Sequence, residues 1–344
     1  MIRVGLIGAG FIGRNHFNQY EKLTERARVV ALCDKEADRR AGDWSKVGGN
    51  LGDAQGTKRD LGSIKPYTAW QDLVADPGID LVDICTPTFT HREIVTAALR
   101  AGKHVLCEKP MALNLDDCDA MLAVAEGAKG QFMIAQCIRF WPEYVYLTQV
   151  FQDRRFGDLQ ALQLRRQAET PAYSLNSWVL NPELSGGAIL DLHVHDVDYA
   201  LGLLGRPEAI TAQACIQANG ASDRVHALWH YAKPQVVQLE GFWDMPAGFG
   251  FNMGYTAVFE QAAVQWDLSS GKPVTVYRRG QQPESPELPP GGDGYFNEID
   301  YFLGCAERNQ RPSVSTPEES RHAVAIGLAE KESAHKGTRV AVQL

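Results

Sequence analysis

A lysine at the end of a strand-like run is the first residue of this sequence whose position suggests chemistry. In "LCEKPMAL", residues 106–113, an apolar run ends in Glu108, Lys109 and Pro110, and these residue types disfavour a sheet interior. A lysine buried at such a point has a lowered pKa, and it can hydrogen-bond a substrate hydroxyl as the proton leaves. These residues alone are equally consistent with a Glu–Lys pair on a surface turn.

A histidine and a carboxylate form the second candidate group. The segment "SGGAILDLHVHDVDYALGLLG", residues 185–205, predicts a Gly-Gly entry and then a helix over 186–204. Residues i and i+4 share a helix face, so Asp191 and His195 are expected to face the same way. An acid beside a histidine orients the ring and stabilises its charged form, as in a general base. A solvated acidic face or a hydrogen-bonded core histidine would give the same pattern. The rings of His193 and His195 point apart on a helix, which disfavours a metal site.

A glycine-rich turn near the start of the chain predicts a dinucleotide site. "GLIGAGFIGRNH" has G-x-G-x-x-G spacing, follows a strand and opens a helical stretch. In this motif Gly8 makes the tight turn, Gly10 lets the backbone approach a pyrophosphate, and Gly13 allows close packing of the helix. The N-terminus of the helix favours phosphate binding.

The residue that ends the next strand bears on the choice of cofactor. Asp34 lies 21 residues after Gly13, where an acid binds the ribose hydroxyls of adenosine. A carboxylate there binds the 2′-hydroxyl of NAD and repels the 2′-phosphate of NADP. Lys35, Arg39 and Arg40 follow closely and could hold a phosphate. We therefore expect NAD, with NADP as the alternative.

The end of a further strand, "ICTPTFTH", is expected to line the nicotinamide ribose, because open α/β sheets bind ligands at the carboxyl ends of their strands. The sequence is equally consistent with two roles for His91, a helix cap at the surface or a residue of the site. The residues predicted to contact the cofactor are Gly8, Gly10, Phe11, Ile12, Gly13, Asp34, Thr86, Pro87, Thr88, His91, Glu108 and Lys109.

The elements that must position these residues change character along the chain. Up to residue 136, short apolar runs alternate with helical stretches, which predicts βαβ units and a parallel Rossmann sheet. The runs lie at 3–8, 28–33, 80–85, 104–107 and 131–135, and the helices at 91–101 and 115–128, with Asn114 as an N-cap. A glycine-rich segment at 41–67 interrupts the pattern. It is either a solvated loop or a functional one, which would be a flap near the adenosine end of the cofactor or a contact with a partner.

From 137 to 344 we expect a second domain with a large, mostly antiparallel sheet and flanking helices. The fold class is therefore α/β followed by α+β. The predicted strands lie at 159–166, 225–230, 235–240, 257–266 and 274–277. The predicted helices lie at 186–204, 295–307 and 317–335, and long loops are expected at 244–256 and 278–294.

Three stretches together resemble a known family. "DICTPTFTHREIVTAALRAGKHVLCEKPMAL", "GGAILDLHVHDVD" and "RFWPEY" resemble the glucose–fructose oxidoreductase, inositol dehydrogenase and rhizopine-catabolism (Gfo/Idh/MocA) family. The resemblance implies a lysine, Lys109, that contacts nicotinamide and substrate, with Asp191 and His195 as the acid and the catalytic histidine. It also allows a cis bond between Lys109 and Pro110. For the second domain, 137–344, the resemblance implies substrate binding and oligomerisation.

The resemblance implies hydride transfer between a nicotinamide cofactor and a secondary alcohol or ketone of a sugar, cyclitol or derivative. A glycoside-cleaving enzyme that oxidises its sugar transiently is an alternative. A dinucleotide-binding sensor without turnover is another, although it has no need of a proton-transfer set. Aromatic side chains pack well on the faces of sugar rings, although the sequence is at least as consistent with a place in the hydrophobic core for Trp141 and Trp178. The candidate substrate contacts are Arg139, Trp141, Tyr173 and Trp178.

Composition limits the partners. The 344 residues carry a formal charge of −8 and no basic cluster, so nucleic acid and anionic membranes are not expected partners. No apolar run reaches the length of a membrane span, the N-terminal residues lack the features of a signal peptide, and no C-x-x-C pair occurs. We expect a soluble cytoplasmic protein with no bound metal.

The sheet of the second domain predicts self-association. Residues 159–277 contain several strands but few helices to cover them, and an uncovered, partly apolar face must be packed by something. The family resemblance implies that a second copy packs this face, so we expect a homodimer or homotetramer built face to face through this sheet. The alternative is a monomer whose long loops at 244–256 and 278–294 fold over the sheet. The candidate contributors, whose face on the sheet the sequence leaves open, are Trp229, Tyr231, Trp243 and Phe251.

Overall fold

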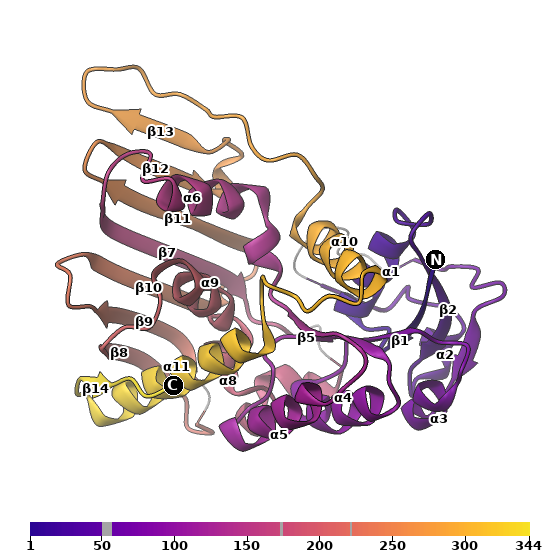
Figure 1. Cartoon of the computed structure of the whole chain (residues 1–344). Coiled ribbons are helices and arrows are strands. Elements are labelled where there is room, and N and C mark those ends of the chain that lie inside the picture. The colour runs from indigo at the N-terminus through magenta and orange to yellow at the C-terminus, as the bar shows by residue number, and fades with distance from the viewer. Residues whose placement is uncertain (50–56, 173–174, 221) are drawn as a thin grey trace. The chain divides into compact units, whose positions relative to one another are not determined.

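Two β-sheets organise the chain in the computed structural model, which describes residues 1–49, 57–172, 175–220 and 222–344 (Figure 1). Unit 1 holds residues 1–137, a short stretch ending at Asn176, and 292–321, while unit 2 holds most of the rest. The sequence places a single boundary after residue 136. The structure adds that 292–321 return to the first unit, where helix α10 (Gly294–Glu307) packs against α1 (Phe11–Tyr20).

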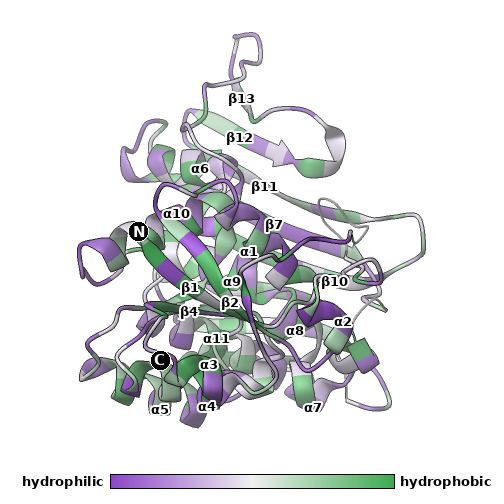
Figure 2. Ribbon diagram, turned by 90° about the vertical axis from the view of Figure 1, so that its right-hand side faces the viewer, coloured by the Kyte–Doolittle hydropathy of each residue, from purple (hydrophilic) through white to green (hydrophobic). Residues whose placement is uncertain are grey.

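Unit 1 is the expected parallel sheet, in the order β3-β2-β1-β4-β5-β6. Its strands are β1 (Ile2–Ile7), β2 (Ala27–Cys33), β3 (Lys65–Tyr67), β4 (Leu81–Ile84), β5 (His104–Glu108) and β6 (Phe132–Ala135). β4 and β6 are buried throughout, and Figure 2 shows hydrophobic colour along the central strands. A parallel sheet covered on both faces requires such apolar runs.

The helices of unit 1 complete the βαβ connections. The connecting helices are α1, α2 (Ala37–Arg40), α3 (Trp70–Ala75), α4 (His91–Arg100) and α5 (Leu115–Glu126), with a 3-10 turn at Thr88–Thr90. Helix α10 packs against α1 and joins no two strands of this sheet. Asn114 caps α5 as predicted, because its side chain accepts the backbone N–H of Asp117 at 2.8 Å. The strand order reverses between β1 and β4, and ligands of open α/β sheets bind at such a switch point.

Unit 2 contains an eight-stranded sheet in the order β13-β12-β11-β7-β10-β9-β8-β14. The described pairs are antiparallel except β7 with β10. The strands are β7 (Leu159–Glu169), β8 (Ala209–Ile216), β9 (Ser222–His230), β10 (Val236–Met245), β11 (Phe251–Phe259), β12 (Ala262–Asp267), β13 (Thr275–Arg278) and β14 (Val340–Ala341).

Helices cover one face of this sheet (Figure 1). They are α6 (Pro142–Gln152), α8 (Gly187–Asp191), α9 (Val194–Leu204) and the C-terminal α11 (Pro317–Lys336), and a short helix, α7 (Pro182–Ser185), contacts α8. Shorter 3-10 turns lie at Cys137–Phe140, Leu175–Leu180 and Leu268–Ser270. No helix among the described residues is both long enough and apolar enough to cross a bilayer.

Three predicted boundaries were wrong. Residues 257–266 are not one strand but parts of β11 and β12, which turn at Glu260 and Gln261 without a Gly, Pro or Asn to mark the turn. The predicted loop at 244–256 already contains most of β11. The predicted helix over 186–204 is interrupted at Leu192 and His193.

The face of the sheet away from these helices carries a row of apolar side chains. The pairings place Val236, Ala161, Val258, Ala263 and Tyr277 beside one another across five adjacent strands. Val236 is 58% exposed, Tyr277 43% and Val258 38%. We call these five residues the open-face row.

The aromatic residues predicted to face a partner lie elsewhere. Trp229 and Trp243 are buried, and Trp229 donates its indole N–H to Glu330 of α11. Phe251 packs against a cluster that contains Trp243, and the hydroxyl of Tyr231 donates to the carbonyl of Gly205. The prediction was wrong for the two tryptophans because the parity of each strand directs them to the helix-covered face.

Candidate active site

The loop between β1 and α1 has the shape that the glycine motif predicts. Gly8 has φ +94°, and a Cβ there would lie 2.4 Å from the carbonyl oxygen of Cys85. A Cβ on Gly13 would lie 1.8 Å from the carbonyl oxygen of Gly8. A Cβ on Gly10 would approach nothing closer than 3.8 Å, at the guanidinium of Arg39. Gly8 and Gly13 thus pack directly against the backbone of the protein, whereas Gly10 has open space beside it.

This arrangement fits a dinucleotide. Gly10 is the N-cap of α1 and supplies no side chain to cap it, so the first N–H groups of the helix are directed at a ligand position beside the open glycine. Anions bind such helix ends, because the N–H groups and the helix dipole both favour negative charge. Gly8, Gly10, Phe11, Ile12 and Gly13 therefore stay our prediction for the pyrophosphate contacts.

Asp34 ends β2 next to this loop and holds it. One carboxylate oxygen accepts the N–H of Ala9 at 2.8 Å, and the other accepts the N–H of Glu36 at 2.8 Å. The guanidinium of Arg39 lies 3.9 Å from the carboxylate. Each carboxylate oxygen retains a second lone pair for a ribose hydroxyl. The structure therefore places both the acid expected for NAD and one of the cations that could hold a phosphate beside Gly10.

The described part of the glycine-rich segment packs onto α1. Trp44 is buried, its ring centroid lies 5.1 Å from that of Phe17, and its indole N–H donates to the carbonyl of Arg39. A Cβ on Gly49 would lie 1.9 Å from the ring of Phe11. Residues 50–56 lie outside the described part. The described part of the segment therefore packs beside Arg39 and the glycine loop, and a functional role for it stays a prediction.

His91 is not a surface cap. It is fully buried, with Nδ1 3.0 Å from the carbonyl oxygen of Pro110 and Nε2 2.9 Å from that of Thr86. Burial lowers the pKa of this histidine. It ties the loop after β4 to the loop after β5, so the loop that includes Thr86, Pro87 and Thr88 is braced. Contact of these four residues with the cofactor stays a prediction.

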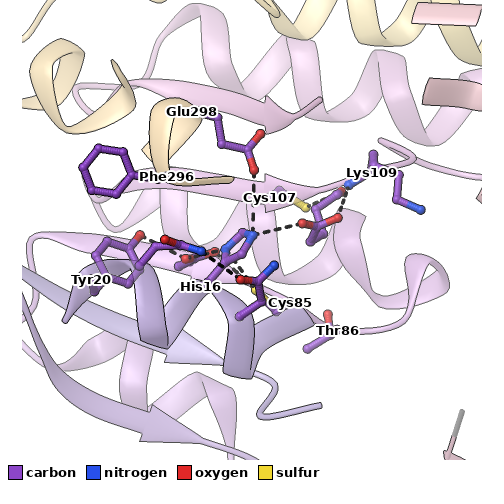
Figure 3. Close-up of polar contacts among 12 residues, drawn as sticks. His16, Tyr20, Cys85, Thr86, Cys107, Lys109, Phe296 and Glu298 are labelled. Carbon is purple, nitrogen blue, oxygen red and sulfur yellow. Dashed lines mark hydrogen bonds and ion pairs between the residues drawn. The ribbon is translucent and has the colours of Figure 1, made fainter. Parts of the chain in front are cut away.

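Lys109 follows directly after β5, at the carboxyl edge of the sheet. The Lys109–Pro110 bond is cis, as the sequence allowed. Glu108 is buried and Lys109 half-buried, and the lysine side chain extends away from the interior group around His16 (Figure 3). Glu108 turns inward instead, and one of its oxygens accepts the backbone N–H of Lys109 at 3.2 Å. The surface-turn alternative for the Glu–Lys pair was wrong, because the two side chains take different sides of the strand end.

In unit 2, Asp191 and His195 are left half-buried in a stretch that is otherwise buried from Gly187 to Leu201. Asp191 ends α8 and His195 lies in the first turn of α9. The two residues do not share one continuous helix, contrary to the prediction, since Leu192 and His193 separate α8 from α9. Their common feature is exposure, and not a shared helical face.

The buried face of α9 is anchored by charges. His193 Nε2 lies 3.0 Å from a carboxylate oxygen of Glu330, and Arg166 Nε donates to Asp196 at 2.7 Å. Burial opposes a charge on His193, but Glu330 outweighs it and raises the pKa of this histidine. These contacts fix the helix so that His195 stays on its open side. Sequence reasoning missed His193 as an anchor, since its partner lies more than 130 residues away in the chain.

The candidate substrate contacts differ in what the structure offers. Arg139 forms a buried ion pair with Asp198, including an Nη2–Oδ1 distance of 2.9 Å, so its guanidinium is already engaged. Trp141 is the N-cap of α6 and half-buried, and Trp178 packs against the cluster around Trp243. Tyr173 lies outside the described residues. As substrate contacts all four stay predictions.

Comparison with known proteins gives matches over most of the chain. Residues 2–136 match the NAD-binding Rossmann fold of the Gfo/Idh/MocA oxidoreductase family, and residues 144–265 match the C-terminal domain of the same family. The chain is 30% identical to 1,5-anhydro-D-fructose reductase of Ensifer adhaerens, over 100% of this chain and 99% of that one. It is 30% identical to inositol 2-dehydrogenase of Rhizobium meliloti, over 89% of each.

Solved structures of the same fold include levoglucosan dehydrogenase in complex with NADH and levoglucosan. The TM-score is 0.85 at 20% identity, with all of each chain covered. This likeness shows that the two-sheet architecture is that of an existing fold.

Proposed function

Because the chain belongs to the Gfo/Idh/MocA oxidoreductase family, we propose that it transfers a hydride between NAD and a secondary alcohol or ketone of a sugar, cyclitol or derivative. The observation that carries the proposal is a cradle for a dinucleotide and a half-buried lysine at the same sheet edge, Gly8–Gly13 and Lys109. The names of the relatives, a reductase of an anhydro sugar and inositol dehydrogenases, support a polyhydroxylated substrate.

The residues would divide the chemistry as follows. NAD, when bound, supplies the acceptor for a hydride that leaves the carbinol carbon. His195 takes the hydroxyl proton as the C–O bond gains double-bond character, and Asp191 stabilises the charge that the imidazole acquires. Lys109 donates a hydrogen bond to the same oxygen. In the reductive direction His195 returns the proton to the oxygen.

The cofactor is proposed to be held by the glycine loop and Asp34, with Arg39 as the residue that would admit NADP. The Asp34 carboxylate offers acceptors to ribose hydroxyls, while its charge disfavours a phosphate. We therefore favour NAD over NADP.

We further propose that the open-face row of unit 2 is covered by a second copy of the chain. An apolar row across five strands is the kind of surface that association buries, and a copy of the same face provides a self-complementary partner.

A substrate panel tests the proposal. The purified protein is incubated with NAD or NADP and a series of cyclitols, hexoses and anhydro sugars, while nicotinamide absorbance is followed. We expect NADH formation with at least one polyol and a lower rate with NADP. Cleavage of a glycoside without net NADH would instead indicate transient oxidation. Tight NADH binding without turnover on any member of the panel would favour a sensor.

A further inference from the structure

A group of ionisable side chains lies inside unit 1, behind the strand end that carries Lys109 (Figure 3). His16 of α1, Asp83 of β4 and Glu298 of α10 are fully buried, and Glu108 of β5 is nearly so. Tyr20 donates its hydroxyl to Asp83 at 2.9 Å, and Cys85 lies 3.4 Å from His16 Nδ1. Four separate elements thus meet at one imidazole ring.

Both nitrogens of that ring face a carboxylate. His16 Nδ1 lies 2.9 Å from Asp83 Oδ2, and His16 Nε2 lies 3.1 Å from Glu108 Oε1. The Nε2 contact has an ion-pair distance but not the geometry of a hydrogen bond. A neutral imidazole has one N–H and no net charge, so it would gain little from the second carboxylate, whereas an imidazolium is attracted to both. The arrangement therefore calls for one more proton, which makes the ring an imidazolium between two carboxylates.

The electrostatic surroundings agree with this charge. Burial would lower the pKa of His16, but Cys85 and the Asp83 carboxylate outweigh it and raise the pKa well above its usual range. Burial also raises the pKa of Glu298 well above its usual range. Glu298 lies 3.9 Å from His16 Nε2, beyond direct hydrogen-bonding distance, so we assign it as a neutral acid at the edge of the group.

The second oxygen of Glu108 points the other way along the chain. Glu108 Oε2 accepts the backbone N–H of Lys109 at 3.2 Å. A continuous set of contacts thus runs from Asp83 through His16 and Glu108 to the backbone of Lys109. His16 belongs to α1, and this helix begins at Gly10 of the dinucleotide cradle.

We infer that His16 and Glu108 are positioning residues, which lock the backbone of Lys109 to the helix that begins at the cofactor cradle. The inference rests on the proposed function, since it assumes that Lys109 takes part in proton transfer. Small misplacements of a reacting group can cost about 10²-fold in rate. A lock of this kind would therefore affect turnover more than the affinity for the cofactor.

Kinetics of variants test the lock. We expect Glu108→Ala and His16→Asn to lower kcat roughly 10- to 100-fold. In His16→Asn, which changes no predicted cofactor contact, the dissociation constant of NADH, measured by fluorescence, should change less than about threefold. Glu108→Gln should regain much of the loss, since its amide oxygen can accept the Lys109 N–H and its NH₂ can donate to a neutral His16. The substrate is the fastest polyol of the panel, also used deuterated at the oxidised carbon. A larger isotope effect in Glu108→Ala would show that the chemical step itself has slowed.

Ser315→Ala is the matched control, because it removes a buried hydrogen bond, to the carbonyl of Ile134, in the same unit. A general loss of stability would slow this variant as much as Glu108→Ala, and that result would overturn the inference. Normal kcat in a folded Glu108→Ala protein would also overturn it.

A spectroscopic measurement decides the charge without relying on activity. The ¹⁵N shifts of the histidine rings are measured in the labelled protein, and the His16 signals are assigned with His16→Asn or by comparison with Glu108→Gln. We expect these shifts to show an imidazolium at about pH 8, which is well above the usual histidine pKa of about 6.5. A neutral His16, or one equivalent of metal retained after chelation, would contradict the assignment.

Lys109→Ala separates the two proposals. If it turns over normally, the proposed role of the lysine fails. If it is inactive while Glu108→Ala is normal, only the positioning fails.

Discussion

His195 and Asp191 are recognisable at the level of single residues by what surrounds them. The residues from Leu192 to Leu201 are buried apart from His195, and several of the polar ones are matched to partners. A titratable side chain that stays half-buried in such a stretch costs less to charge than a buried one and can still reach a ligand. Lys109 has the same intermediate exposure, whereas its neighbour Glu108 is buried.

The first prediction concerns these proton-transfer residues. Lys109→Ala and His195→Ala should each lower kcat by roughly 10² or more, the scale of general acid–base catalysis. The affinity for NADH should survive in His195→Ala, since this residue belongs to unit 2 and the glycine loop to unit 1. Steady-state kinetics on the panel substrate and NADH titration measure the two quantities. Near-normal turnover in either variant would remove that residue from the mechanism.

The second prediction concerns Asp34. The unmodified protein should bind NADH more tightly than NADPH, and Asp34→Ala should narrow the gap, because the carboxylate repels the 2′-phosphate. The affinity for NADH should also fall in this variant, since Ala9 loses its acceptor.

Dissociation constants of both cofactors, for Asp34→Ala and for Arg39→Ala, provide the measurement and its control. Arg39→Ala should weaken NADPH more than NADH if the guanidinium is the phosphate contact. Equal or tighter binding of NADPH to the unmodified protein would contradict the expected preference for NAD.

At the scale of elements, α9 is placed by charges on its buried side. His193 reaches Glu330 on α11 and Asp196 reaches Arg166 on β7. Gly241 makes room for the histidine, since a Cβ there would lie 2.8 Å from His193 Cβ. An apolar helix face could slide or rotate on a sheet, whereas paired charges have one favourable arrangement. The site residue His195 thus depends on contacts made by its neighbours.

The third prediction follows from the raised pKa of His193. A folded-state pKa above the unfolded one means that protonated His193 stabilises the fold fully below about pH 6.5. This contribution is lost as the pH rises through the folded-state value. His193→Gln should therefore lower the midpoint of thermal unfolding by roughly 5 °C or more at low pH, and by less at high pH.

Thermal unfolding across the pH range, for both proteins, measures this difference. His335→Gln is the control, because His335 is exposed on α11, the helix that carries Glu330, and its replacement should change the unfolding midpoint little. A His193→Gln effect that grows with pH would contradict the assigned direction.

For the whole molecule, the open face of the second sheet sets the expected assembly. The covered face holds the tryptophans that the sequence suggested for a partner, while the open-face row holds smaller apolar residues and one tyrosine. Residues along one strand alternate between the two faces of the sheet. The register of a strand therefore decides which face a residue occupies, and the size of its side chain does not.

The fourth prediction is that this row joins two copies. Light scattering on the unmodified protein should give a multiple of the 37.9 kDa chain. Val258→Glu, at the centre of the row, should shift the mass towards a single chain, because a carboxylate buried in an apolar contact is costly. Val314→Glu is the control, since Val314 has a similar exposure, 36%, but lies in unit 1. A mass of 37.9 kDa for the unmodified protein would refute the assembly.

The sequence by itself determined the features that short stretches encode. The glycine spacing, the acid at the end of β2, the E-K-P at the end of β5 and the cap at Asn114 all depend on neighbours within a few residues or one βαβ unit. Apolar runs in parallel strands and glycines at positive φ have few alternatives. The Rossmann unit and its family could therefore be read from the chain alone.

Tertiary structure decided what depends on distant partners. The return of 292–321 to unit 1, the engagement of Arg139 by Asp198, and the pairing of His193 with Glu330 have no local signal. The β11–β12 turn lacks the usual turn residues, and the break between α8 and α9 contradicts the helical period that Asp191 and His195 suggested. His16 is the last residue of the glycine-rich stretch "GLIGAGFIGRNH", and nothing in that stretch indicates its partners. Its two carboxylate partners come from β4 and β5, and only the parallel pairing of those strands beside α1 brings them to the same ring.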